Sequence, residues 1–330
     1  VKNDEGIYDT VYVYTSKKET EPLAVLPKNV MVHDIIDVDY KGNKKYDTVK
    51  SMNLMEIDPD GDNIKIYVSG SMDIHEDRVF SPKYLYQNVV DNVGYPADAG
   101  MLVAEYGEEL YQCMLPMWDK YNQWQSDALH YLIESEGYDV VFSHNHCVDA
   151  QLHSFVRHIK NRDYSKYSEE TAIDYMEKVY EQTDEYVGSF LHYLDEGWTI
   201  FLVSDHALVC PEYERPAFGD PYGVNVGVMR ALGFTVMKKD ENGNDTHEID
   251  WTKTTAVASR ACNIYINLKG RYDHGIVDPE DKYELEEKIM TALYSYKHPV
   301  SGNRVFGLAL RNKDAVILGY GGDQCGDIVA

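Results

Sequence analysis

Residues 1–80 carry short apolar runs of nearly alternating polarity, which predict β-strands. The runs "YDTVYVYTS" (8–16) and "NIKIYVSG" (63–70) are rich in Val, Ile and Tyr. In "DPDGDN", just before the second run, Gly61 is the fourth residue, whereas an EF-hand loop needs its glycine at the sixth position. We therefore predict a hairpin turn there rather than a calcium loop, and a β-rich insert or lead-in over residues 1–80.

From about residue 81 the apolar residues take up helical spacing. Ser81 as N-cap and Pro82 as the first helical residue predict a helix over 81–94. The pattern predicts two longer amphipathic helices, over 115–137 with a glycine stop and over 168–197.

Two continuous apolar runs flank the last of these helices and predict buried strands. "YDVVFSH" (138–144) precedes it and "WTIFLVSDH" (198–206) follows it, and such runs are typical of parallel sheets covered on both faces. Strand, helix and strand in this order form a right-handed crossover. We expect residues 81–330 to form one α/β domain, with helices on both faces of a mostly parallel sheet.

Charge and cysteine content exclude several classes of protein. There are 31 Lys and Arg residues against 56 Asp and Glu residues, a formal net charge of −25. This excess would repel a nucleic-acid backbone and is otherwise a common means of keeping a protein soluble. The five cysteines include no CxxC pair, which argues against a disulfide scaffold or a cysteine zinc site and favours a reducing compartment.

The ends of the chain bear on where it functions. No apolar run approaches the ~18 residues needed to span a bilayer, and no signal-peptide pattern opens the chain, so we expect a cytoplasmic protein. The chain begins at Val1 and ends on the apolar "GDIVA" (326–330), which reads as an interrupted strand. We expect a piece of a larger protein.

Acidic residues and histidines follow both predicted buried strands. Asp149 and His153 are four residues apart in the first turns of a helix, so their side chains share one face. Asp205 and His206 are adjacent after the second strand. Ligands of such folds bind at the carboxyl ends of parallel strands, and carboxylate plus imidazole suits zinc or another first-row ion. Each pair alone is commonly a solvated surface feature; both together favour a metal site.

The other histidines of "SHNHCVDAQLHSF" (143–155) are weaker candidates. His144 and His146 lie in the strand-to-helix loop, where they would support the ligands or face substrate, and His158 lies off the face of His153. Cys147 is expected to be a buried, inert thiol.

These motifs resemble a known family. "VVFSHNHCVDAQLHSF" followed by "IFLVSDHA" resembles the metal motifs of the alkaline phosphatase superfamily, specifically the type I phosphodiesterase/nucleotide pyrophosphatase-like phosphohydrolases. Further segments resemble the C-terminal half of its microbial branch: "GVNVGVMRALGF" (223–234), "IDWTKTTAVA" (249–258), "NIYINLKGR" (263–271), "GIVDPEDKYELEEKIMTAL" (275–293) and "HPVSGNRVF" (298–306). The resemblance covers residues 81–330.

The resemblance implies a two-metal hydrolase of small phosphorylated substrates. One ion would be held by Asp149, His153 and a later histidine, and the other by Asp205, His206 and an earlier aspartate. The ions are expected to be zinc, with manganese as the alternative. The family's nucleophile is a threonine or serine near its N-terminus, and paired ions activate it and stabilise the charge of an in-line displacement.

The chain departs from the family pattern in several places. Ala207 stands where a glycine is usual, and Gly326 where a proline is usual. We find neither the first metal-binding aspartate with its nucleophile in residues 1–80 nor the last histidine motif in 307–330, and His274 is interpreted as a surface residue. The chain alone is therefore expected to have little or no activity.

Two alternatives remain open. One is another branch of the superfamily, such as a sulfatase or phosphonate hydrolase, although no cysteine lies in a CxPxR-like setting. The other is a non-catalytic binding module that keeps the fold.

Overall fold

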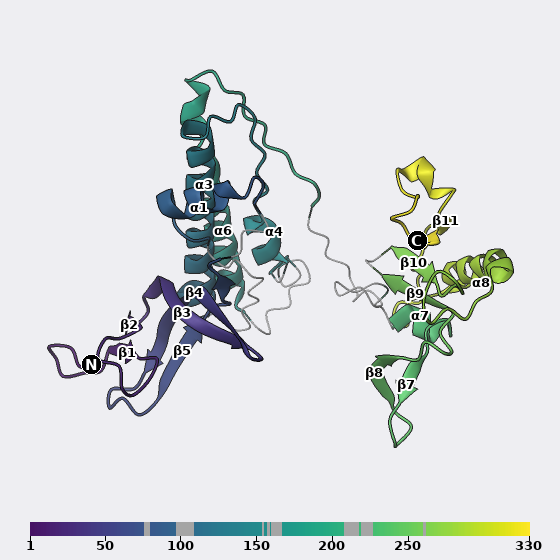
Figure 1. Cartoon of the computed structure of the whole chain (residues 1–330), viewed down its shortest axis with the longest axis horizontal. Coiled ribbons are helices and arrows are strands. Elements are labelled where there is room, and N and C mark those ends of the chain that lie inside the picture. The colour runs from purple at the N-terminus through teal and green to yellow at the C-terminus, as the bar shows by residue number, and fades with distance from the viewer. Residues whose placement is uncertain are drawn as a thin grey trace. The chain divides into compact units, whose positions relative to one another are not determined.

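The computed structural model (Figure 1) divides the chain into two compact units, Val1–Cys210 and Pro211–Ala330. It describes residues 1–75, 80–96, 109–153, 155–156, 159, 167–207, 218, 227–259 and 262–330. The predicted boundary near residue 80 falls inside the first unit and stays a prediction. We describe each unit by itself.

The N-terminal part of unit 1 is built from antiparallel strands, as the alternating pattern predicts. The strands within residues 1–75 are β1 (Thr10–Val13), β2 (Ala24–Pro27), β3 (Met31–Lys41), β4 (Lys44–Ile57), β5 (Ile64–Val68) and β6 (Met72–Asp73). β1 pairs with β2, while β4 lies between β3 and β5 and also pairs with β6. The β-rich character expected for this region is confirmed.

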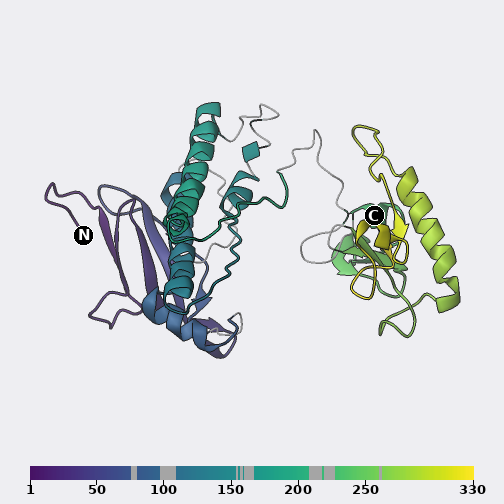
Figure 2. The ribbon, with the colours of Figure 1, turned by 90° about the horizontal axis from the view of Figure 1, so that it is seen from above.

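β4 lies between β3 and β5, and side chains on both of its faces contact other elements. Met52 and Leu54 belong to an apolar cluster with Leu26 of β2. Asn53, which alternates with them, donates its amide N–H to the carbonyl of Gln112 in η1 (Leu110–Met114). The helices of unit 1 thus gather on one side of the β3–β5 sheet (Figures 1 and 2).

The segment between β4 and β5 is a hairpin turn, as predicted. The backbone N–H of Asp58 donates to the carbonyl of Asn63 at 3.0 Å, and Gly61 donates to Asp58 at 2.9 Å. Gly61 has φ of +83°, a conformation that L side chains rarely adopt.

Three helices form the core of the rest of unit 1. α3 (Leu115–Glu134) packs alongside α6 (Glu169–Gly188), and the short α4 (Cys147–Leu152) also contacts α6. These helices bury one apolar and aromatic cluster: Met114, Trp118, Cys147, Leu152, Phe155, Tyr167, Ala172, Tyr175 and Val179. The two long amphipathic patterns are confirmed as helices, and a 3₁₀ turn, η2 (Leu191–Leu194), follows α6.

The predicted start of the first helix is wrong by two residues. α1 is Tyr84–Asn92, and its N-cap is Lys83, which makes no side-chain capping hydrogen bond. Ser81 and Pro82 precede the helix, and the carbonyl of Pro82 instead accepts a hydrogen bond from the N–H of Leu85 at 3.2 Å. α1 contacts α3.

The two apolar runs predicted as buried parallel strands are not strands in this structure. Residues 139–143 and 199–203 belong to no helix or strand, and among the described residues they form no backbone–backbone hydrogen bond. Their side chains are exposed, including Phe142 at 94 % and Val203 at 85 %. A parallel strand of this kind needs neighbours that supply hydrogen bonds and cover its faces. The described residues offer neither to these two runs. Every ladder between the named strands of the described residues is antiparallel.

Unit 2 combines a four-stranded sheet with one long helix. Its described elements are α7 (Gly227–Ala231), β7 (Met237–Lys239), β8 (Asp245–Ile249), β9 (Ala256–Ser259), β10 (Asn263–Ile266), η3 (Pro279–Asp281), α8 (Lys282–Ser295), β11 (Leu310–Arg311), η4 (Ala315–Leu318) and β12 (Ile328–Val329). The sheet order is β11-β12-β10-β9. α8 lies beside this sheet (Figure 2) and packs its Ile289 and Leu293 into the same core as Ile264 and Ile266.

The end of the chain is held inside this sheet. The carboxylate of Asp327 accepts hydrogen bonds from the backbone N–H of Ile266 at 2.8 Å and from Arg271 at 2.7 Å, and pairs with Lys282 at 3.0 Å. A Cβ at Gly326 would lie 2.6 Å from the carbonyl oxygen of Ile264. Glycine at 326 therefore permits the close approach of β12 to β10, and "GDIVA" is confirmed as strand-forming.

These elements make a mixed α/β protein with several small sheets. Among the described residues, no helix combines the length and apolar character that crossing a membrane requires.

Candidate functional site

Asp149 and His153 are brought together by the short helix α4. Asp149 lies in its first turn and His153 is its C-cap. His153 Nε2 lies 3.1 Å from Asp149 Oδ1. The side chain of Asp149 is 30 % exposed and that of His153 is 59 % exposed, so the pair faces solvent from a supported position. The shared face predicted from the four-residue spacing is confirmed.

A buried polar network fixes the start of α4. Asn145 Oδ1 accepts the backbone N–H of Cys147 at 2.8 Å, and Asn122 of α3 accepts the amide of Asn145 at 3.0 Å. The Cys147 thiol is fully buried and accepts an N–H of Gln151 at 3.1 Å. Burial raises the pKa of Cys147, which keeps the thiol neutral and unreactive. The predicted burial of this thiol is confirmed, and the network orients the helix that carries Asp149.

Asp205 and His206 lie at the end of the second apolar run. Asp205 Oδ1 accepts the backbone N–H of His206 at 3.0 Å, and Asp205 Oδ2 lies 3.4 Å from His206 Nε2. Ser204 Oγ donates to the carbonyl of His206 at 2.8 Å. Both side chains are more than half exposed. Local hydrogen bonds alone shape this pair.

The structure brings ligands together within each pair but does not assemble the expected four-ligand site. No three of Asp149, His153, Asp205 and His206, all of which are described, place ligand atoms within 4.8 Å of one another. The prediction relied on a shared edge of a parallel sheet, and the segments that precede the two pairs do not form that sheet here.

The donor atoms of the first pair suit a cation. Asp149 Oδ1 is shielded from solvent, and His153 Nε2 at 3.1 Å does not meet hydrogen-bond geometry, so among the described residues this oxygen accepts no hydrogen bond. A solvent-shielded carboxylate oxygen without a hydrogen bond is costly, and a divalent ion shared with the nearby imidazole would satisfy it. Carboxylate plus imidazole is also a donor set that suits zinc. Asp149 and His153 therefore fit the metal that such a motif requires.

The other histidines of the sequence are placed as follows. His144 and His146 are exposed and lie side by side, with ring centroids 4.1 Å apart. His274 is exposed, which confirms the interpretation as a surface residue. His158 lies outside the described residues.

A different cluster, which the sequence alone did not suggest, meets metal-ligand spacing. One ligand atom each from His130, Glu134 and His192 lies within 4.8 Å of the others. His130 and Glu134 are four residues apart on α3, a signal visible in the sequence. The third member is supplied by η2, so only the packing of α3 beside the end of α6 completes the cluster.

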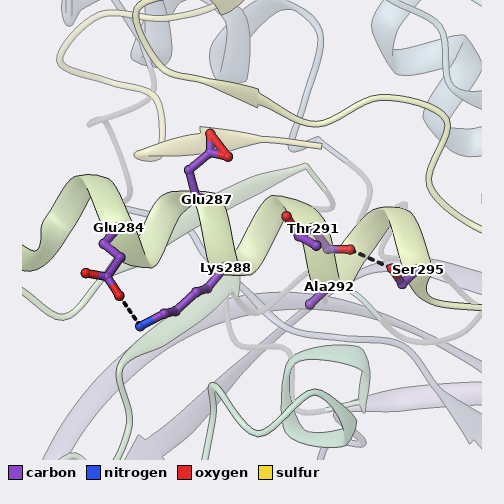
Figure 3. Close-up of a pocket in the computed structure, with 6 residues that line it drawn as sticks. All are labelled: Glu284, Glu287, Lys288, Thr291, Ala292 and Ser295. Atoms are coloured by element: carbon purple, nitrogen blue, oxygen red, sulfur yellow. Dashed lines mark hydrogen bonds and ion pairs between the residues drawn. The ribbon is translucent and has the colours of Figure 1, made fainter.

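Unit 2 contributes an open depression along the exposed face of α8 (Figure 3). It is lined by Glu284, Glu287, Lys288, Thr291, Ala292 and Ser295. Figure 3 shows Glu284 and Lys288 turned toward each other, in an ion pair of 2.6 Å, and Ser295 Oγ donates to the carbonyl of Thr291. These are ordinary contacts between successive turns of a helix, and none of the predicted ligands lines the depression.

The sequence model of the type I phosphodiesterase / nucleotide pyrophosphatase family matches residues 41–330. The chain belongs to this family, and the match begins well before residue 81, where the resemblance in individual motifs begins. Comparisons with curated proteins and with solved structures gave no match.

Proposed function

We propose that this protein is a metal-dependent phosphohydrolase in which Asp149, His153, Asp205 and His206 hold two divalent ions, zinc or alternatively manganese. The substrate is a small phosphorylated molecule, a phosphodiester or a phosphate monoester. The observation that carries the proposal is the family match over residues 41–330, which contains both carboxylate–imidazole pairs. Ions bound there would supply positive charge that stabilises the oxygens of phosphoryl transfer.

The proposal requires that residues 138–144 and 198–206 join a parallel sheet when the ions are bound. Two features support it: most of their apolar side chains are exposed, and a ligand pair follows each segment. If the two segments became neighbouring parallel strands, their carboxyl ends would meet at one edge of the sheet. The four ligands would then approach one another.

The residues of the chain have distinct roles in this proposal. Asp149 and Asp205 provide anionic oxygens, and His153 and His206 provide neutral nitrogens, which leaves each ion with open positions for substrate. Asn122 and Asn145 hold the start of α4 and so position Asp149. No nucleophile has been identified in the chain, so we expect the chain alone to turn over substrate very slowly.

The metal site is tested by substituting one ligand in each pair. Purified chain would be titrated with Zn²⁺, and bound metal counted by atomic absorption after gel filtration. We expect Asp149→Asn and Asp205→Asn each to lower the Zn²⁺ affinity by more than about tenfold, since even residues that only support ligands change affinity by 10–100-fold. His274→Ala is the matched control, because it alters an exposed histidine of unit 2.

Two outcomes would contradict parts of the proposal. If both asparagine variants bind Zn²⁺ as the unaltered chain does, these residues are not ligands. Hydrolysis of a p-nitrophenyl phosphodiester with added Zn²⁺ or Mn²⁺ is expected to be near background. Rapid turnover that vanishes in Asp205→Ala would mean instead that the chain holds its own nucleophile.

A further inference from the structure

We propose that His130, Glu134 and His192 form a second, separate binding site for one divalent zinc-like ion, located where the C-terminal turns of α3 meet η2. One ligand atom from each residue lies within 4.8 Å of the others. The site shares no residue with the pairs at Asp149 and Asp205, so it goes beyond the proposed function. The hydrogen bonds that orient the two imidazoles support this site.

The hydroxyl of Tyr193 fixes the tautomer of His130. Tyr193 donates its hydroxyl proton to Glu134 Oε1 at 2.9 Å. The hydroxyl oxygen of Tyr193 also lies 2.7 Å from His130 Nδ1. Because the hydroxyl proton is already given to Glu134, Nδ1 must carry the hydrogen of this contact. The lone pair of neutral His130 is therefore on Nε2.

A backbone carbonyl fixes the tautomer of His192 in the same way. His192 Nδ1 lies 2.9 Å from the carbonyl oxygen of Ser189. A carbonyl only accepts, so Nδ1 must be the donor, and the lone pair of the neutral ring is again on Nε2. Metal-binding histidines characteristically donate their second ring nitrogen to an oxygen, which fixes the tautomer and orients the ring. Both histidines of this cluster meet that condition.

Aromatic packing keeps the rings in place without closing the site. His130 stacks on Phe190 with centroids 4.9 Å apart, and the rings of His130 and His192 are 5.5 Å apart. Tyr193 is buried beneath them at 3 % exposure. Glu134 and His192 are exposed, so an ion can enter from solvent. The three ligands are thus held by α3 and η2 and remain accessible to solvent.

The donor set indicates the class of ion. Two imidazole nitrogens and one carboxylate oxygen suit zinc and its first-row neighbours, and three protein ligands leave a position for water. An ion bound here would link α3 to η2 and so stabilise the packing of α3 against α6. We therefore expect binding to raise the melting temperature of the chain.

The test uses the full chain carrying Asp149→Asn and Asp205→Asn, so that the proposed hydrolase site does not contribute. Co²⁺ would replace Zn²⁺ as a visible probe, with absorption followed during titration and reversed by added Zn²⁺. We expect one equivalent of Co²⁺ to bind. Adding His192→Ala or Glu134→Gln should weaken binding by more than about 100-fold, beyond the usual effect of losing a supporting residue. Both side chains are exposed, so neither change should unfold the chain.

Two further variants sharpen the assignment. Tyr193→Phe keeps the ring but removes the oxygen that orients His130, and should weaken Co²⁺ binding by about 10–100-fold. His247→Ala, which changes an exposed histidine on β8, is the control and should leave binding unchanged. The proposal is overturned if the background chain takes up no Co²⁺, or if His192→Ala and Glu134→Gln bind as the background does. Either result would leave the separate test of Asp149 and Asp205 unaffected.

Discussion

The apolar segments of the two units have similar composition but different surroundings. In unit 2, Ile264 and Ile266 of β10 are fully buried, between β12 and β9 and beneath α8. In unit 1, Phe142 and Val203 lie on segments that pair with no strand among the described residues, and both side chains are almost fully exposed. An apolar run therefore becomes a core strand only where other elements supply hydrogen bonds and cover its faces. The candidate metal ligands follow the two runs that lack this support.

Hydrogen exchange should give the largest difference between these segments. The amides of residues 264–266 lie in a central strand, whereas residues 139–143 and 199–203 make no backbone–backbone hydrogen bond among the described residues. We expect the segments 139–143 and 199–203 to exchange faster by a factor on the order of 10³ or more, since core amides exchange only through opening that costs several kcal/mol. Mass spectrometry of peptic peptides would measure this. Equal protection in the metal-free chain would mean that the two runs are already paired in a sheet, which would contradict their exposed positions.

Truncating one side chain in each environment should give the next largest difference. Ile266→Ala empties part of a fully buried core and should lower the free energy of unfolding by about 2–5 kcal/mol. Phe142→Ala removes a ring that is 94 % exposed and should change it by less than about 0.5 kcal/mol. Urea denaturation followed by circular dichroism would compare the two. A loss above about 2 kcal/mol for Phe142→Ala would contradict the exposed position.

The smallest expected effect is a pH dependence of the free energy of unfolding that arises from the N-terminal sheet. It tests whether this part of unit 1 buries the imidazole of His33. Burial, together with the positive charge of Lys120, lowers the pKa of His33 below its ordinary value of 6.5, although Asp34 opposes the shift. His33 Nδ1 also lies 2.9 Å from Ser51 Oγ. As the pH falls through 6.5 the unfolded chain takes up this proton first, so stability should be lost below that pH and remain constant above it.

The variant His33→Gln isolates this contribution. The urea midpoint of the unaltered chain minus that of the variant should be constant above pH 7. This difference should decrease between pH 6.5 and 5, because only the unaltered chain loses stability through His33. A difference that is independent of pH, or that grows in favour of the unaltered chain on acidification, would contradict the burial of this imidazole.

Periodicity in the sequence was sufficient for the helices and for the antiparallel strands. The spacing of apolar residues predicts α3 and α6, and alternating polarity predicts β1 and β5. In each case the apolar residues recur with the period of the element, so they lie on the one face that packs against the protein. It was insufficient for residues 138–144 and 198–206. A continuous apolar run does not specify which neighbours cover it, and in this structure none of the described elements does.

The candidate sites also differ in how far the sequence predicts them. The sequence by itself determined the pairs: Asp149 and His153 meet through the pitch of a helix, and Asp205 and His206 are adjacent. The motif order also led to the family, which the match over residues 41–330 confirms. These relations are local or serial, so they can be read along the chain.

Only the tertiary structure decided which ligands share a space. It left the two predicted pairs unassembled, and it brought His192 to His130 and Glu134 across about sixty residues of chain. The tautomer of His130 depends on the hydroxyl oxygen of Tyr193, which meets the ring only when η2 packs against α3. Such contacts arise from the packing of elements distant in sequence, and no local pattern of residues encodes them.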